Sequence, residues 1–149
     1  MVPSHSNLTV TMNTKSSNNL KAVSSLHLTK DCWTLWAHLP QDNNWGLDSY
    51  IKVSTYKSIE EVIAITETLP EPLVKYCMLF VMKEGIAPMW EDPRNKDGGN
   101  FSYKISNKIV METWRDLSYM LVGGVLSNNA DIASSITGIS ISPKKNFCI

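Results

Sequence analysis

The chain has 149 residues, 43% of them apolar, which is the size and composition of one globular domain and excludes a wholly disordered protein. Its 14 Lys and Arg balance its 14 Asp and Glu, so it lacks the basic excess that holds non-specific duplex binders on DNA. Three widely spaced cysteines, Cys32, Cys77 and Cys148, form neither a disulfide framework nor a zinc knuckle, which favours a reduced, intracellular protein.

The N-terminal segment, residues 1–26, is dominated by Ser, Thr and Asn and has no sustained hydrophobic period. This composition predicts a disordered polar tail, followed by a folded domain over residues 27–149. No stretch of the chain is apolar over the length that a bilayer requires, so we expect neither a signal peptide nor a membrane partner.

Short runs rich in aromatic and β-branched residues predict five strands. They cover residues 32–37, 47–53, 76–82, 101–105 and 132–141. The third run is continuously apolar, as is typical of a central strand, and Gly138 interrupts the last one, as expected at a bulge.

Two segments predict helices. The first begins at the capping box Ser58-Ile59-Glu60-Glu61 and ends before Pro70 and Pro72. The second covers residues 111–122, with apolar side chains at helical spacing and Gly123-Gly124 as its left-handed C-cap. Because the gap between the first two strands is too short for a crossover helix, the elements indicate an α+β protein with an antiparallel sheet.

The sequence offers no signature for enzyme chemistry, phosphate loops or metal binding. We expect His38 to be an ordinary, partly exposed residue. Glu91 and Asp92 are adjacent, so their carboxylates point to opposite faces and make a poor acid–base pair. The sequence therefore predicts a protein that is not an enzyme and that needs no cofactor and no metal.

Trp90 and Trp45 stand out among the five tryptophans. Trp90 precedes Glu91 in a loop bounded by Pro and Gly, and Trp45 lies in the polar stretch 42–46. Trp90 alone is typical of an indole that covers a core edge. As an exposed pair, the two indoles could instead sandwich a flat, positively charged ring. Glu91 could then accept two N–H bonds from the edge of a guanine, a donor pair that adenine lacks.

The segment around Trp90 resembles the mRNA cap-binding translation initiation factor 4E family. The resemblance covers residues 27–149. Its most specific part is the series Leu79-Phe80, Gly85-Ile86, Pro88 to Asp92, Asn95-Lys96 and Gly98-Gly99. Trp33-Thr34-Leu35-Trp36 precedes this series in the chain, and Trp114 with Leu117 and Leu121 follows it. It implies a curved, mostly antiparallel sheet with helices on the convex face and a slot for 7-methylguanosine on the concave face.

The resemblance also implies roles for individual residues. Trp45 and Trp90 stack on the methylated ring, and Glu91 binds the guanine edge. Lys145 matches a basic position near the cap phosphates, with Lys144 beside it as a substitute contact. The remaining tryptophans, Trp33, Trp36 and Trp114, are expected to be structural.

Two departures concern the phosphates and the length. Asn100 and Ser140 stand where members of the family usually place Arg, so phosphate neutralisation should be weaker. The chain stops inside an expected late strand, which implies a C-terminally short member or a fragment. Its Asn- and Lys-rich, Arg-poor composition favours a parasite or a large DNA virus as its source.

A second surface is implied on the convex face, where the family binds the scaffold factor 4G or repressors through a short helical motif. The positions that correspond to this surface are His27, Leu28, Ile59, Ile63, Asp116, Tyr119 and Gly123, of which His27, Ile59, Asp116 and Gly123 match or nearly match the family pattern. Ile63, Tyr119 and Leu28 replace a usual Trp, Leu and Pro. These changes indicate either an altered partner surface or, for Ile63, a simple core position.

Together these features predict a cytoplasmic protein (host cytoplasm if viral) that binds capped mRNA and recruits it for translation, with no DNA partner. The alternatives are a cap-occupying repressor or decoy with altered scaffold binding and, less favoured, a nucleotide- or cap-processing enzyme.

Overall fold

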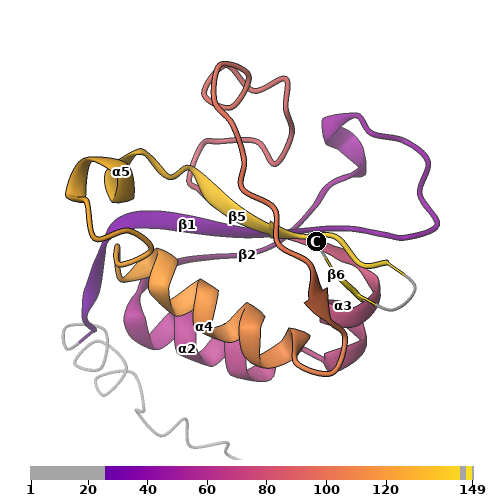
Figure 1. Ribbon diagram of the computed structural model, residues 1–149, viewed down its shortest axis with the longest axis horizontal. Coiled ribbons are helices and arrows are strands. Elements are labelled where there is room, and N and C mark those ends of the chain that lie inside the picture. The colour runs from indigo at the N-terminus through magenta and orange to yellow at the C-terminus, as the bar shows by residue number, and fades with distance from the viewer. Residues whose placement is uncertain (1–25, 145–146, 149) are drawn as a thin grey trace, which may run out of the picture.

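The computed structural model describes residues 26–144 and 147–148 (Figure 1). Its elements in chain order are β1 (Leu28–His38), η1 (Leu47–Ser49), β2 (Ile51–Ser58), α2 (Ile59–Thr68), α3 (Glu71–Tyr76), β3 (Met78–Lys83), β4 (Ile105–Ser106), α4 (Val110–Val122), α5 (Ala130–Ser135), β5 (Gly138–Ile141) and β6 (Phe147–Cys148). Four strands form a sheet in the order β2-β1-β3-β5, in which all neighbours are antiparallel, and β4 pairs with β6. The predicted α+β class with an antiparallel sheet is confirmed.

The two faces of the sheet carry different elements. Figure 1 shows α2 and α4 against one face and the two long loops, 39–50 and 84–104, rising from the other. The alternation of β1 explains this division, because Trp33, Leu35 and Ala37 are buried in the core that the helices cover. The intervening residues of β1, His38 among them, therefore face the side of the loops.

The capping box at the start of α2 is present as predicted. The Glu61 N–H donates to Ser58 Oγ at 3.2 Å, and the Ser58 N–H donates to Glu61 Oε2 at 3.1 Å. The short helix α3 was not predicted, because Pro72 was interpreted only as a helix terminator. Proline is well tolerated in a first turn, where its missing N–H has no partner to lose.

Four of the predicted strands need correction. The one expected over residues 76–82 is β3 and begins only at Met78, because Tyr76 ends α3. Residues 47–49 form a 3₁₀ turn, and β2 begins only at Ile51. The expected strand 101–105 is reduced to the two residues of β4, and Phe101 and Tyr103 are exposed. The first half of the expected strand 132–141 is α5, whose N-cap Asn129 accepts two backbone N–H bonds at 2.9 and 3.2 Å.

The expected bulge at Gly138 is wrong. The register between β3 and β5 runs without a shift, from Leu79 opposite Ile141 to Met82 opposite Gly138. A Cβ at Gly138 would lie 2.4 Å from the carbonyl oxygen of Val81, so the glycine permits a close approach of two strands.

The second predicted helix is confirmed as α4, which buries Val110, Trp114 and Leu121. Its left-handed residue is Gly124, with φ of 68°, whereas Gly123 keeps helical angles. Trp33 and Trp114 are buried, as expected for structural tryptophans. Apart from Leu26, the predicted tail over residues 1–26 lies outside the described residues, so its disorder stays a prediction.

Within residues 26–144 and 147–148, no helix is both long and apolar enough to cross a membrane. In the same part of the chain, no three His, Cys, Asp or Glu side chains gather where they could hold a metal ion.

Candidate functional site

The loop that carries Trp45 is ordered by its own side chains. The Asn44 N–H donates to Asp42 Oδ1 at 2.8 Å, and the Gly46 N–H donates to Asn44 Oδ1 at 2.8 Å. The Ser49 hydroxyl closes the following turn on the Gly46 carbonyl oxygen at 2.7 Å. Such short polar side chains hold a turn without a strand ladder. Trp45 itself stays 56% exposed on this framework.

His38 supports Trp45 from below, which the sequence did not predict. Its imidazole is only 1% exposed, so the expectation of a partly exposed residue is wrong. The ring stacks on the Trp45 indole with centroids 4.3 Å apart and planes 2° apart, and Nε2 lies 2.8 Å from the carbonyl oxygen of Asn44. The loop after β1 folds back over the end of that strand, and so encloses a residue that would otherwise meet solvent.

Tyr50, at the end of this loop, packs against the strands β1 and β3. Its ring lies 5.0 Å from the His38 ring and meets Phe80 edge-on at 5.6 Å. Burial raises the pKa of Tyr50, and the nearby Glu91 carboxylate raises that pKa further. Glu91 therefore lies within electrostatic reach of the aromatic cluster beneath Trp45.

Asp92 organises the Trp90 loop from within. Its carboxylate is 9% exposed and accepts the backbone N–H groups of Ala87 at 2.8 Å and Arg94 at 2.9 Å. These bonds hold the pKa of Asp92 below its usual value. Glu91, its neighbour, is exposed; the two acids lie in a turn and not in the strand that the prediction of opposite faces assumed.

Asn95 closes the same loop. Its amide donates to the carbonyl oxygens of Ala87 at 3.0 Å and Met89 at 2.9 Å, while its own oxygen accepts from the Thr137 hydroxyl at 3.1 Å. Because Thr137 directly precedes β5, these bonds fasten the loop to the sheet. Sequence reasoning missed this role for Asn95.

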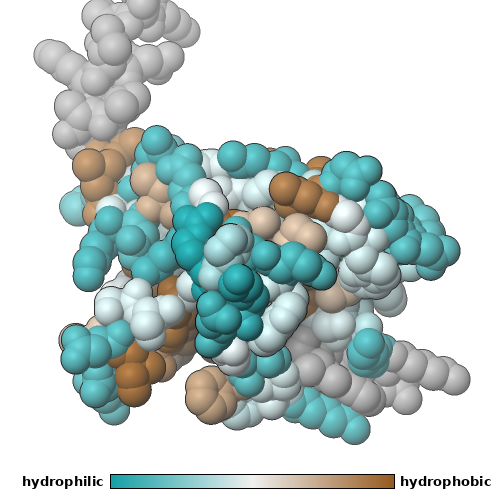
Figure 2. Space-filling model, turned by 90° about the horizontal axis from the view of Figure 1, so that it is seen from above, coloured by the Kyte–Doolittle hydropathy of each residue, from teal (hydrophilic) through white to brown (hydrophobic). Residues whose placement is uncertain are grey.

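Two exposed indoles and one carboxylate thus project from anchored loops on the same side of the sheet. Trp90 is 59% exposed, close to the value for Trp45, whereas Trp33 and Trp114 are buried. Figure 2 views the molecule from this side and shows a largely hydrophilic face with scattered hydrophobic groups. Exposed indole faces on such a surface are suited to stack on a flat, cationic ring.

An apolar groove lies on the helix side of the molecule. It has a volume of about 160 Å³ and is lined by Ile59, Val62, Ile63, Tyr119, Val122 and Gly123. Four of the seven predicted partner residues therefore line one depression between α2 and α4, and Ile63 is exposed rather than a core residue. Sequence reasoning missed Val62 and Val122, which helical spacing places beside Ile59 and Tyr119.

The other predicted partner residues flank this groove. His27 Nδ1 lies 2.5 Å from Glu60 Oε1, and the His27 carbonyl oxygen accepts the Ile59 N–H at 2.9 Å. Leu28 beside it is exposed, and Asp116 is exposed one helical turn before Tyr119.

The Tyr119 hydroxyl is tied to α2. It donates to Glu67 at 2.7 Å, and burial, followed by this bond, raises the pKa of Tyr119 to about 12. The hydroxyl is thus engaged at the rim, and the aromatic ring remains to line the groove.

The profile of the family described as eukaryotic initiation factor 4E matches residues 27–149. The chain belongs to this family. Among curated members, the initiation factor 4E of Candida albicans is 32% identical over 125 residues, covering 76% of this chain and 57% of that protein. The initiation factor 4E homolog of Acanthamoeba polyphaga mimivirus is 36% identical over 63 residues, covering 42% of this chain and 23% of that protein. The chain thus spans less than two thirds of the length of these relatives.

Solved structures of the 4E family share the fold. A schistosome initiation factor 4E, solved with m7GpppG and 4E-BP, matches 83% of this chain and 69% of its own, with a TM-score of 0.73 and 22% identity. Initiation factor 4E-3 of Ascaris suum, solved with an m2,2,7G cap, matches 83% of this chain and 70% of its own, with a TM-score of 0.68 and 20% identity. The predicted sheet of the 4E fold, with helices on one face, is confirmed.

Of the two basic residues that the 4E resemblance assigned to phosphates, only Lys144 belongs to the described part of the chain. Lys144 is exposed just after β5, and no hydrogen bond or ion pair among the described residues joins it to Trp45 or Trp90. Lys145 lies outside the described residues. Asn100 donates to the Ser102 hydroxyl at 3.0 Å. The phosphate contacts therefore stay a prediction.

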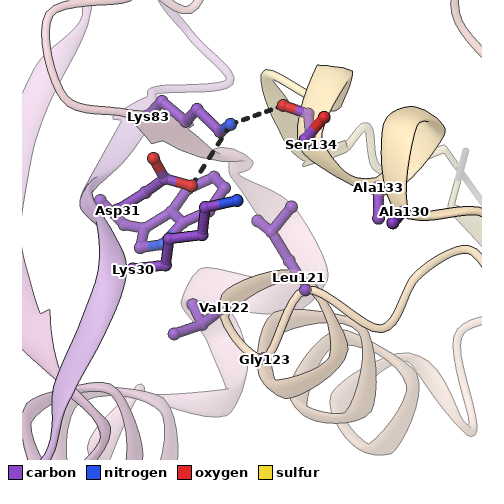
Figure 3. A pocket seen from close by; sticks show the side chains of 11 residues that line it. Lys30, Asp31, Lys83, Leu121, Val122, Gly123, Ala130, Ala133 and Ser134 are labelled. Carbon is purple, nitrogen blue, oxygen red and sulfur yellow. Dashed lines mark hydrogen bonds and ion pairs between the residues drawn. The ribbon is translucent and has the colours of Figure 1, made fainter.

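A second cavity, of about 220 Å³, adjoins the groove of this 4E-family chain and shares Val122 and Gly123 with it (Figure 3). Across it, the Lys83 ammonium reaches Asp31 Oδ2 at 3.3 Å and the Ser134 carbonyl oxygen at 2.9 Å. Lys83 thereby fastens α5 to β1 beside the groove.

Proposed function

We propose that this chain binds the 7-methylguanosine cap of mRNA between Trp45 and Trp90, without catalysis, and brings capped mRNA into translation initiation in the cytoplasm. The observation that carries the proposal is the pair of half-exposed indoles on anchored loops above one side of the sheet, with Glu91 next to Trp90. Membership of the initiation factor 4E family and the cap analogue named with the schistosome structure support it.

In this proposal the two tryptophans and Glu91 recognise different features of the cap. Methylation at N7 gives the guanine ring a positive charge, and an indole face attracts a cation by about 0.5–2 kcal/mol, depending on desolvation. The Glu91 carboxylate accepts the two N–H groups on the guanine edge, and bonds to a charged acceptor contribute about 1.5–3 kcal/mol. The tryptophans therefore select the methylated ring, and Glu91 selects guanine over adenine.

The test is a fluorescence titration with 7-methyl-GTP and with GTP. We expect much tighter binding of 7-methyl-GTP, and loss of that binding in Trp45→Ala and Trp90→Ala although both variants stay folded. Tyr76→Ala is the matched control, because Tyr76 is an exposed aromatic residue at the end of α3. Equal affinity of the wild type for the two nucleotides, or full binding by both tryptophan variants, would refute the sandwich.

Phosphate recognition should be weak in this member. Asn100 and Ser140 carry no charge at positions where the family usually has Arg, and an exposed ion pair contributes only about 0.2–1 kcal/mol. We expect affinity to rise only a few-fold from mono- to triphosphate cap analogues. A steep gain with every phosphate would show that lysines have replaced the missing arginines.

The groove between α2 and α4 is our proposed docking site for a helical segment of scaffold factor 4G or of a binding protein. Its apolar lining and its position on the face opposite the tryptophans support simultaneous use of both surfaces. Co-purification on 7-methyl-GTP resin tests the recruiting role, because a recruiting protein retains the scaffold. Retention of the cap with no scaffold would favour the alternative, a cap-occupying repressor or decoy.

A further inference from the structure

The buried imidazole of His38 has a geometry that the proposed cap slot would use. The His38 and Trp45 rings are parallel within 2° at a centroid distance of 4.3 Å, and His38 is 1% exposed whereas Trp45 is 56% exposed. A buried ring thus covers one face of an exposed indole. Only the opposite face of Trp45 is open to a ligand, so His38 decides from which side the ligand stacks.

His38 is itself held firmly. It is the last residue of β1, an inner strand of the sheet, and it pairs with Met78 of β3. Its ring also packs against Tyr50, at 5.0 Å, which in turn meets Phe80. The imidazole therefore holds the loop over residues 39–50 in place relative to the sheet, although this loop has no strand pairing of its own.

A hydrogen bond adds a second point of attachment. Nε2 lies 2.8 Å from the carbonyl oxygen of Asn44, and because a carbonyl can only accept, Nε2 carries the proton and donates it. Asn44 is the residue immediately before Trp45. One side chain therefore fixes both the indole ring and the backbone that leads into it.

Resting on the proposed function, we propose that His38 is a positioning residue of the cap slot, which holds the Trp45 indole in its stacking orientation before the cap arrives. A side chain that is already ordered loses less conformational freedom on binding, so affinity depends on a residue that never touches the ligand. Stacking of the His38 ring supplies the orientation of the indole, and the Nε2–H bond supplies the position of the loop.

Three substitutions separate these contributions. His38→Phe keeps a flat ring and loses the donor, His38→Gln keeps a donor and loses the ring, and His38→Ala loses both. Val74→Ala on α3 is the control for lost core packing, because Val74 is fully buried on the helix side. Each variant is measured for its melting temperature, its affinity for 7-methyl-GTP, and the near-ultraviolet circular dichroism that disappears on adding Trp45→Phe.

We expect His38→Phe to bind 7-methyl-GTP within about threefold of the wild type, and His38→Gln and His38→Ala to bind at least tenfold more weakly. The Trp45 dichroism should persist in the Phe variant and collapse in the other two, whereas Val74→Ala should lower the melting temperature alone. Wild-type affinity in all three variants, or an equal loss in Phe and Ala, would overturn the proposal. If the wild type did not bind 7-methyl-GTP, the cap function would be refuted instead. The positioning role would then still be tested by dichroism, and an unchanged Trp45 signal in His38→Gln and His38→Ala would overturn it.

Discussion

Replacing Asp92 should weaken cap binding although its carboxylate is bonded within its own loop. Asp92 accepts backbone N–H bonds from Ala87 and Arg94, and these bonds close the loop that presents Trp90 and Glu91. Asp92→Ala removes both acceptors at once. The loop should then populate open conformations that no longer hold Trp90 and Glu91 in the arrangement that the proposed cap slot requires.

The size of the effect follows from the two lost bonds. A bond to a charged acceptor contributes about 1.5–3 kcal/mol, but Arg94 is exposed and Ala87 only half-buried, so water can replace part of each. We therefore expect the closed loop to lose about 1–2 kcal/mol. If binding must restore the closed loop, apparent affinity for 7-methyl-GTP falls about 5- to 30-fold.

Two measurements distinguish this loss from the loss of a direct contact. Fluorescence titration gives the affinity of each variant, and thermal unfolding gives its melting temperature. Glu91→Ala should lower the affinity at unchanged melting temperature, because Glu91 is exposed, whereas Asp92→Ala should lower both quantities.

The lowered pKa of Asp92 sets the pH dependence of stability. The stabilisation by the Asp92 carboxylate is complete above the pKa of the unfolded state, near 4, and is lost as pH falls through the pKa of the folded state. The stability difference between wild type and Asp92→Asn should thus shrink below about pH 4. Wild-type affinity and stability in Asp92→Ala would refute the reasoning.

Two further substitutions test the other loop and the groove. Gly46→Ala should weaken 7-methyl-GTP binding only about two- to threefold in the same titration, because its Cβ would lie 2.6 Å from Asp48 Oδ1, and this exposed carboxylate can turn away at the cost of its bonds from Asn44 Nδ2. Gly99→Ala has nothing within 4 Å and should bind normally. Ile63→Trp should tighten binding of a helical 4E-binding-protein peptide in an anisotropy titration, because an indole at the groove offers the peptide more contact area and an N–H donor. Tight binding by the wild type with no gain from the tryptophan would remove the case for a specialised partner.

Local signals in the sequence predicted the elements that depend on neighbouring residues. The capping box at Ser58 and the helical period of α4 involve residues three or four apart, so short-range patterns are sufficient for them. Trp45 and Trp90 were identifiable because large aromatic residues in polar loops are conspicuous. The family resemblance then indicated which of the five tryptophans should act together.

The parts that were missed depend on contacts between distant segments. The burial of His38 requires a loop that folds back over the end of β1, and no pattern around residue 38 reports that. The closure of the Trp90 loop by Asn95 likewise depends on Thr137, which lies 42 residues later. Residues 132–136 alternate enough to suggest a strand, yet the capping side chain of Asn129 starts a helix there.

The groove and the proposed cap slot lie near opposite ends of β1. Leu28 at the start of β1 pairs with Ser58 beside the groove, and His38 at its end supports Trp45. Eleven residues of strand at about 3.3 Å each separate these ends by about 30 Å, far beyond the 7–10 Å over which substitutions usually interact. The core residues of β1 lie between the surfaces and form one packed layer with the helices.

We therefore expect a peptide in the groove and 7-methyl-GTP in the slot to bind together, each within about twofold of its affinity for the free protein. Titration of 7-methyl-GTP at saturating peptide measures this directly, and His38→Gln should weaken the nucleotide while leaving the peptide unchanged. Competition between the two ligands would contradict the assignment of separate faces. If each ligand instead strongly raised the affinity for the other, the two sites would share a conformational equilibrium. Such coupling would show that β1 does not separate the two sites rigidly.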